Sequence, residues 1–397
     1  MTSGNSTDPV LAALRSVLGS HEPFLPLHEP LFAGNEWDYV KQCLDSGWVS
    51  SVGSFVDRFE DDLASYTGVK RAVAVVNGTA ALHICLLLAG VKTGDEVLVP
   101  TLTFIATANA VSYCGAVPHF IDSEELTLGV DPHKLALYLE QIAVQHPDGC
   151  FNRQTGRRIK AVVPMHTFGH PVDLDPLCEV CRRFGIELVE DAAESLGSFY
   201  KGRHTGHWGR LSALSFNGNK TITTGGGGAI LTNDAELGQR AKHLTSTAKV
   251  PHRWAFDHDS LGYNYRMPNL NAALGCAQLE RLPAMLEMKR SLARRYDRAF
   301  AQVAGITFFR EPGFARSNYW LNTLLLDKGK DDMAERDGLL QRGNDCGMML
   351  RPAWSLLHRL PMFADCPAMG LSCAESLQRR IVNIPSGAKS GIPYAEA

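Results

Sequence analysis

Short apolar segments alternate with helical patterns through the first half of the chain, and this alternation limits the fold more than any other feature. The apolar segments lie at 72–76, 96–100, 117–121, 161–164, 187–191 and 211–216. Helical patterns stand between several of them, at 81–88, 106–113 and 174–184. Strands that are apolar on both faces and alternate with helices are typical of a mostly parallel sheet with helices on both sides. The sequence therefore predicts an α/β fold.

The chain before and within this alternation holds three further segments. We expect residues 1–25 to form a tail with one short helix, followed by amphipathic helices at 34–46 and 55–67. Residues 142–158 are polar and interrupt the rhythm, so we expect an exposed insertion there.

After Gly262 the pattern changes to that of a second domain. A long helical stretch at 271–300, which we expect to break at Pro283, comes before apolar strands at 306–309 and 321–326. A further helix is expected within 331–346. The predicted organisation is a tail (1–25), a large domain (26–262) and a small C-terminal α+β domain (263–397).

The composition excludes several functional classes. Lys and Arg (39) against Asp and Glu (42) give a formal net charge of -3, without the basic excess of nucleic-acid-binding proteins. No apolar run approaches the roughly 18 residues of a membrane-spanning helix, and the polar N-terminus lacks a signal-peptide pattern. Ten irregularly spaced cysteines favour reduced thiols, so we expect a cytoplasmic protein. Cys178 and Cys181 form a CxxC inside a helical pattern with no second pair nearby, which favours a structural role over a metal site.

One lysine stands out in the segment 215–228. Lys220 follows an apolar strand, lies among small polar residues and comes just before a run of four glycines. Small residues let a carbonyl cofactor approach the backbone, and a lysine in such a turn suits a covalent bond to that carbonyl. A surface lysine beside a glycine-rich hairpin explains the segment equally well when it is taken alone.

Three other features also follow strands. Asn77-Gly78-Thr79-Ala80 opens a helix, where free N–H groups and a hydroxyl can bind phosphate, although a plain N-cap is the commoner explanation. Asp191 ends the strand 187–191 and could hold a protonated ring nitrogen, or simply cap a helix. Phe104 could stack on a ring, or belong to the core.

These features complement one another. The carboxyl ends of parallel strands meet at one edge of a sheet, which is where ligands bind. A phosphate seat, a carboxylate, an aromatic face and an amine together match the phosphate, ring nitrogen, ring and aldehyde of pyridoxal phosphate. The set predicts this cofactor far more strongly than any single member does.

The same residues carry a family resemblance. The sequence is similar to the sugar aminotransferases of the DegT/DnrJ/EryC1/StrS family, which have the aspartate-aminotransferase-like (type I) fold. The resemblance covers roughly residues 25 to 390 and is carried by 77–82, 94–97, 100–104, 190–194, 215–220 and 262–266.

The resemblance implies roles for the residues around the cofactor ring. Lys220 would be the Schiff-base lysine, and Asp191 would pair with the pyridine nitrogen. Phe104 would stack on the ring, and Glu194 would lie near the phenolic oxygen, where many members have glutamine. Gly226 departs from a common glutamate, and Asn217 from a common aromatic residue or histidine, which leaves substrate detail open.

The resemblance also implies how the phosphate is held. Thr79, Ala80 and Ser215 would bind it within one subunit. Asn264 would reach the phosphate of the neighbouring subunit, because sites in this family are completed across a homodimer. Within a single chain, Asn264 could instead cap the helix that follows.

Four sequence segments resemble one subgroup of this family: 26–30, 47–53, 263–269 and 319–322. They resemble the enzymes that aminate C4 of a UDP-linked 4-keto-6-deoxy-2-acetamido sugar, as in legionaminic-acid synthesis. The implied reaction moves an amino group from an amino acid, glutamate in most of the family, through pyridoxamine phosphate to the sugar. The product would serve surface-glycan or nonulosonic-acid synthesis.

Other interpretations stay open. A 3-dehydratase of 4-ketosugars would use the same cofactor, but relatives of that kind replace the lysine with histidine. A regulatory, non-catalytic member would be expected to lose Lys220 or Asp191, and both are present. Arg266 or His166 could meet an anionic part of a substrate, although each alone is more often structural.

Overall fold

The computed structural model describes residues 8–19, 24–327, 329 and 333–391. Its helices are α1 (Pro9–Leu18), α2 (Glu36–Ser46), α3 (Ser54–Thr67), α4 (Gly78–Leu88), α5 (Ile105–Tyr113), α6 (Pro132–Ile142), α7 (Leu174–Phe184), α8 (Ala235–Thr245), α9 (Asn269–Phe300), α10 (Met333–Asp345) and α11 (Ser372–Arg380). The strands of the main sheet are β1 (Arg71–Val75), β2 (Glu96–Pro100), β3 (Val117–Ile121), β6 (Ile159–Val162), β7 (Glu187–Asp191), β10 (Leu211–Ser215) and β11 (Gly228–Thr232). The remaining strands are β4 (Ala143–His146), β5 (Gly149–Asn152), β8 (Phe199–Tyr200), β9 (Arg203–His204), β12 (Ile306–Phe308), β13 (Ala315–Arg316), β14 (Asn322–Leu326), β15 (Arg351–Pro352) and β16 (Ile381–Ile384).

The main sheet confirms the predicted α/β fold. Its order is β1-β11-β10-β7-β6-β2-β3, and β10, β7, β6, β2 and β3 run parallel. Strand β11 pairs antiparallel with both β1 and β10, so the sheet is mixed. Its strands are almost wholly buried, which accounts for their continuous apolar runs.

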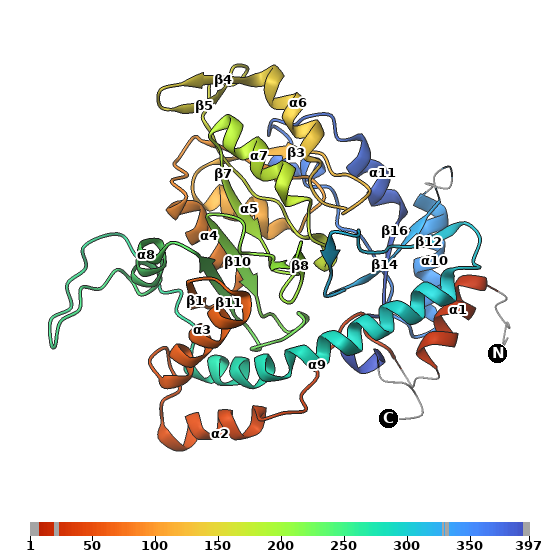
Figure 1. Cartoon of the computed structure of the whole chain (residues 1–397), viewed down its shortest axis with the longest axis horizontal. Coiled ribbons are helices and arrows are strands. Elements are labelled where there is room, and N and C mark those ends of the chain that lie inside the picture. The colour runs from red at the N-terminus through yellow and green to blue at the C-terminus, as the bar shows by residue number, and fades with distance from the viewer. Residues whose placement is uncertain (1–7, 20–23, 328, 330–332, 392–397) are drawn as a thin grey trace.

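Helices cover both faces of this sheet (Figure 1). Buried residues of α4, α5 and α8 pack on one face. On the other face, α3 and α9 cover the β1–β11–β10 half, and α6 and α7 cover the β6–β2–β3 half. This packing of helices on the sheet fixes the position of each strand end, and therefore the position of the side chains just beyond the strands.

The second sheet, β12-β14-β16-β15, belongs to the C-terminal part of the chain. Helix α9 links the two regions, because its first half packs with α3 and its second half joins a core with α1 and the second sheet (Figure 1). The predicted tail contains helix α1, whose Leu11 and Leu14 are fully buried in that core. The domain boundaries themselves stay a prediction.

Two sequence-based expectations need correction or refinement. The break at Pro283 is wrong, because α9 runs unbroken from Asn269 to Phe300 with Pro283 inside it. The insertion at 142–158 contains an ordered antiparallel hairpin, β4–β5, with partly exposed residues.

Three broad properties accompany this fold. In the described part of the chain, no helix is long and apolar enough to cross a membrane. Among the same residues, no cluster of three or more His, Cys, Asp or Glu side chains is arranged to hold a metal ion. All ten cysteines are free, so Cys178 and Cys181 do not pair in a disulfide.

Candidate active site

A cavity of about 310 Å³ opens at the carboxyl ends of the main-sheet strands. Six of the predicted site residues line it: Thr79, Phe104, Asp191, Glu194, Ser215 and Lys220. They lie at or just after the ends of β1, β2, β7 and β10, because the carboxyl ends of parallel strands meet at one edge of a sheet. Residues far apart in the sequence therefore meet at one place.

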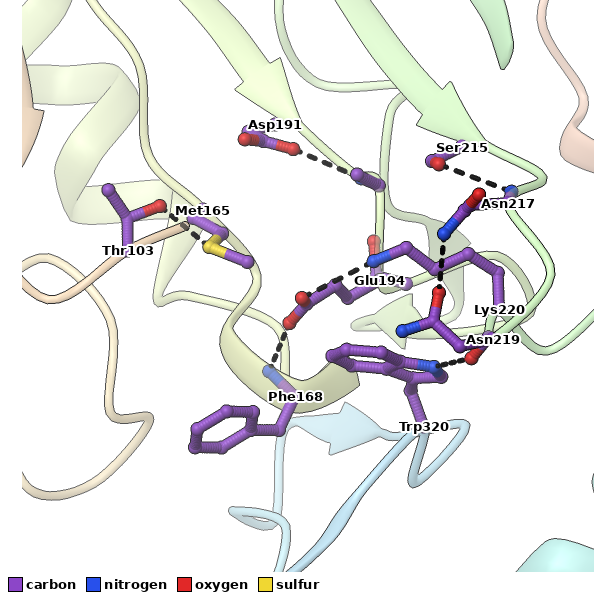
Figure 2. Close-up of polar contacts among 12 residues, drawn as sticks. Thr103, Met165, Phe168, Asp191, Glu194, Ser215, Asn217, Asn219, Lys220 and Trp320 are labelled. Carbon is purple, nitrogen blue, oxygen red and sulfur yellow. Dashed lines mark hydrogen bonds and ion pairs between the residues drawn. The ribbon is translucent and has the colours of Figure 1, made fainter. Parts of the chain in front are cut away.

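Lys220 reaches this cavity from the loop between β10 and β11. The loop is closed by backbone hydrogen bonds from Phe216 to Gly227 and from Thr224 to Phe216. A short turn, in which the Lys220 N–H donates to the Asn217 carbonyl, sets the direction of the lysine. Its Nζ lies 3.4 Å from Glu194 Oε1 (Figure 2). The side chain is largely buried, with 14% of its surface exposed.

The indole ring of Trp320 lines the cavity next to the Lys220 amine. Lys220 Nζ lies 4.0 Å from the centroid of the Trp320 ring, a cation–π contact. The indole Nε1–H donates to the Asn219 carbonyl at 2.7 Å, which holds the ring under the lysine (Figure 2). The sequence predicted no site role for Trp320, which stood only in the segment 319–322 that carries part of the family resemblance. Its contact with Asn219 joins residues 101 positions apart, and no local pattern indicates such a contact.

Asp191 is a buried carboxylate at the end of β7. Its Oδ2 accepts a hydrogen bond from Thr107 Oγ1 at 2.7 Å, and its Oδ1 accepts one from the Ala193 N–H at 3.2 Å. Burial raises the pKa of Asp191 above its ordinary value. A cation placed against this carboxylate would therefore offset a desolvation cost. Thr107 was not predicted, because a threonine one turn into a helix matches no motif.

Glu194 lies between Lys220 and the turn at 167–169. Its Oε2 accepts a hydrogen bond from the Phe168 N–H at 2.9 Å. Phe168 holds a left-handed backbone conformation with φ 56°, and this aims its N–H at the carboxylate. Burial raises the pKa of Glu194 to about 7, although the charge of Lys220 acts in the opposite direction.

The predicted phosphate seat lies where the start of α4 meets the end of β10. A Cβ on Gly78 would come within 3.0 Å of Ser215 Cβ, so this turn needs glycine to approach Ser215. The Ala80 N–H is already bonded to Asn77 Oδ1 at 2.8 Å, as in an ordinary N-cap. Ala80 lines a neighbouring pocket, which shares Asn77 and Thr79 with the cavity.

Phe104 is not a core residue. It stands just before α5, lines the cavity and keeps 49% of its surface exposed. A half-exposed ring beside a buried carboxylate and an amine offers a face on which a flat ligand can stack. Trp354, which was not predicted, adds a second aromatic wall and packs on Phe168 with ring centroids 5.0 Å apart.

Three further candidates lie outside the cavity. Asn264 is exposed, and its backbone pairs with Ser246. The N-cap position of α9 belongs to Pro268, so Asn264 does not cap that helix. His166 is fully buried, with Nε2 3.0 Å from Glu190 Oε2 and Nδ1 bonded by the Val172 N–H, which is a structural role. The backbone of Arg266 forms an antiparallel β-bridge with that of Val75, and Arg266 does not line the cavity.

Comparison with known proteins decides the family. Residues 31–390 match the model of the DegT/DnrJ/EryC1/StrS aminotransferase family. This chain belongs to that family. GDP-perosamine synthase of Caulobacter vibrioides is 37% identical over 92% of this chain and 94% of that protein. EpsN of Bacillus subtilis, named provisionally as a pyridoxal phosphate-dependent aminotransferase, is 38% identical over 91% of this chain and 90% of its own length.

Solved structures agree with this family assignment. The aminotransferase TlmJ from Streptoalloteichus hindustanus superimposes with a TM-score of 0.83 at 29% identity, covering 94% of this chain and 95% of that chain. As a DegT/DnrJ/EryC1/StrS aminotransferase, the chain is an enzyme, and pyridoxal phosphate is its cofactor. The predicted type I fold is confirmed. The relatives do not single out the legionaminic-acid subgroup, since GDP-perosamine synthases are among them.

The residues present fit this cofactor. The cavity offers a buried amine for the aldehyde, a buried carboxylate for a protonated ring nitrogen and a half-exposed aromatic ring, Phe104, that also lines it. The start of α4 supplies N–H groups beside the hydroxyls of Thr79 and Ser215 for a phosphate. This donor set complements each end of pyridoxal phosphate.

Proposed function

We propose that this enzyme transfers an amino group from L-glutamate to C4 of a nucleotide-linked 4-keto-6-deoxy sugar, with a UDP-linked 2-acetamido sugar as the first candidate. One observation carries the proposal. A largely buried amine and a buried carboxylate, Lys220 and Asp191, line one cavity together with an aromatic ring and a helix N-terminus. Phrases such as 26–30 and 319–322 support the UDP-linked sugar.

Lys220 and Asp191 would each act on one part of the cofactor. When bound, pyridoxal phosphate supplies a ring that accepts an electron pair from the carbon bearing the amino group. Lys220 Nζ would hold the aldehyde carbon of the cofactor. As a free amine, it would take the proton from the Cα of the amino acid, and later in the reaction it would give a proton back. The Asp191 carboxylate keeps the ring nitrogen protonated.

Other residues position the reactants. The hydroxyls of Thr79 and Ser215 and the N-terminus of α4 would bind the phosphate, with Ala80 contributing to that turn. Phe104 would stack on one face of the ring, and Trp320 would close the cavity on the side of the amine that its ring contacts. Glu194 lies next to the amine, near the expected place of the phenolic oxygen.

A GDP-linked sugar is the second candidate. The relatives named GDP-perosamine synthase, at 37% identity over most of the chain, favour it. The sequence segments that resemble the legionaminic-acid subgroup favour a UDP-linked sugar. The two candidate substrates differ in the base of the nucleotide, whereas the reacting carbon of the sugar, C4, is the same. Substrate competition therefore decides between them.

The experiment follows the visible absorbance of the enzyme-bound cofactor. Glutamate should abolish the absorbance, and a 4-keto-6-deoxy sugar should restore it with release of the aminated sugar. UDP-linked and GDP-linked ketosugars are supplied separately, and the ratio of their kcat/KM values names the nucleotide. If glutamate bleaches the band but no nucleotide-linked ketosugar restores it, the sugar substrate is wrong. If another amino acid bleaches it in place of glutamate, the donor is wrong.

We further propose that the active unit is a homodimer with shared sites. The segment between α8 and α9 extends away from the rest of the protein (Figure 1). Trp254, Phe256 and Leu261 on it are 73%, 76% and 81% exposed. Large apolar side chains on an extended segment favour burial against another chain. Asn264 lies in the same segment, after these three residues, and would contact the partner's phosphate. A cytoplasmic location is consistent with ten free cysteines.

A further inference from the structure

Glu194 has an unusual set of neighbours for a carboxylate. Only 3% of its surface is exposed, and its two oxygens are approached by different donors. Oε1 faces Lys220 Nζ at 3.4 Å, and Oε2 accepts the Phe168 N–H at 2.9 Å. The only charged donor in this set is therefore the amine that the reaction uses.

The cavity as a whole carries more negative than positive charge. Among the residues that line it, the charged side chains are Asp191, Glu194 and Lys220, two carboxylates against one ammonium. A bound phosphate adds further negative charge to the same space. A buried carboxylate without a cation is costly, and proteins commonly avoid that cost by protonating the group.

The chemistry of Lys220 removes that cation. A lysine amine attacks a carbonyl carbon only after its ammonium proton has left. From the 3.4 Å contact we propose that the proton passes directly from Lys220 Nζ to Glu194 Oε1, and that Glu194 stays neutral while the cofactor is bound. The Nζ–H bond breaks, the Oε1–H bond forms, and no electron transfer is involved. Glu194 is then the base that activates Lys220.

The electrostatics of Glu194 support this transfer. Burial raises its pKa to about 7 while Lys220 is still charged. Since the lysine charge lowers the pKa of Glu194, loss of that charge moves the pKa further upward. The nearby carboxylate of Asp191 acts in the same direction by like-charge repulsion. Glu194 is thus largely ionised above about pH 7 without cofactor, and loss of the Lys220 charge favours its neutral form.

The test is an infrared difference spectrum of the protein before and after addition of pyridoxal phosphate at about pH 8, one unit above the pKa of about 7. A neutral carboxyl group has a C=O stretching band that an ionised one lacks. We expect such a band to appear in the wild type on cofactor binding and to be absent in Glu194→Gln. At about pH 6 Glu194 is already protonated, so the change on binding should be much smaller.

Glu60 offers a matched control. It is also a mostly buried carboxylate that faces one lysine and one backbone N–H, namely Lys242 at 2.6 Å and Ala74 at 2.8 Å. It lies outside the cavity, so Glu60→Gln should keep the new band. Asp191→Asn should also keep it, which distinguishes the two carboxylates of the cavity.

The inference rests on the proposed function, because it requires the cofactor to be attached to Lys220. The visible absorbance of the cofactor, recorded on the same samples, separates the two. If no visible band develops, cofactor binding at Lys220 fails and the inference falls with it. If the visible band develops but no neutral carboxyl band accompanies it, or the band survives in Glu194→Gln, the proton transfer is wrong and the proposed function stands.

Discussion

Asp191 shows how a single residue depends on its surroundings. The carboxylate is buried, its pKa is raised by that burial, and its hydrogen bonds come from Thr107 and the Ala193 N–H. In water such a group would be a poor partner for a weakly basic ring nitrogen. In this cavity, the missing hydration makes a cation the favoured partner.

Asp191→Asn should separate cofactor binding from catalysis. Asparagine preserves the shape but cannot hold the ring nitrogen protonated, so we expect the cofactor to stay bound while turnover falls by roughly 100-fold or more. Absorbance measures the bound cofactor, and the rate of sugar amination measures turnover. An unchanged rate would show that Asp191 is not the partner of the ring nitrogen.

Thr107→Val should move the pH dependence of the reaction. The Thr107 hydroxyl stabilises the ionised form of Asp191, and its removal raises the pKa of that carboxyl further. A hydrogen bond to a charged group is worth about 1.5–3 kcal/mol, or about one to two pH units. Because the reaction needs ionised Asp191, the acid limb of the kcat/KM profile should shift to higher pH by about that amount, with activity recovering in alkaline solution.

Thr103→Val is the control for that shift. Thr103 Oγ1 contacts Thr107 Oγ1 at 3.1 Å and Met165 Sδ at 2.7 Å, and it makes no hydrogen bond to Asp191. Its acid limb should stay close to that of the wild type. An equal shift in both variants would mean that the pH dependence reports local packing and not the charge on Asp191.

Elements were predictable where a local pattern decides them. Six of the seven main-sheet strands, all but β11, lie within about two residues of their predicted bounds, because each is a short, mostly apolar run. The break at Pro283 was wrong for a physical reason. Packing of Leu282, Met285 and Leu286 in the core along α9 outweighs the roughly 3 kcal/mol that a proline costs inside a helix.

Helix α11 illustrates an element held from a distance. It has no side-chain cap of its own, and Asp122, which follows β3, accepts hydrogen bonds from the N–H groups of Ala374 at 2.8 Å and Cys373 at 3.2 Å. Lys134 Nζ lies 2.9 Å from the same carboxylate. Asp122, from the main-sheet region, thus caps the N-terminus of α11, a helix of the C-terminal region.

Asp122→Ala should lower the free energy of unfolding by about 1–2 kcal/mol, which is typical of a lost N-cap. Urea denaturation of the two proteins measures the difference. Lys134→Met removes the ion pair and leaves the cap in place, so it should cost less, because Lys134 is 42% exposed. Equal losses in the two variants would assign the stability to the ion pair.

At the scale of the whole molecule, the cavity depends on contacts that the sequence does not reveal. Lys220, Asp191, Thr79 and Phe104 could be predicted, because each lies at or just beyond the end of a strand at the same edge of the sheet, whereas Ser215 was implied by the family resemblance. Trp320 and Trp354 come from the C-terminal part of the chain, and their arrival at the cavity depends on how that part packs on the main sheet. No local pattern encodes such packing.

The shared site of the proposed homodimer is tested by complementation. Lys220→Ala and Asn264→Asp, each inactive alone, are mixed and refolded together. Aspartate at 264 would place a negative charge against the phosphate. If Asn264 acts across the interface, each heterodimer has one site with both defects and one with neither, so activity should return to about half of that of a wild-type dimer. Verified heterodimers without activity would show that Asn264 serves its own chain.

The central claim is that Lys220 holds the cofactor. Its most direct measurement is reduction of the loaded enzyme with borohydride, followed by digestion and mass spectrometry of the peptides. We predict that the mass of the reduced cofactor appears on Lys220 alone, and that Lys220→Arg, which has no amine that can lose its proton, shows no label and at least roughly 100-fold less turnover. A label on another lysine, or a fully active Lys220→Arg variant, would contradict the account.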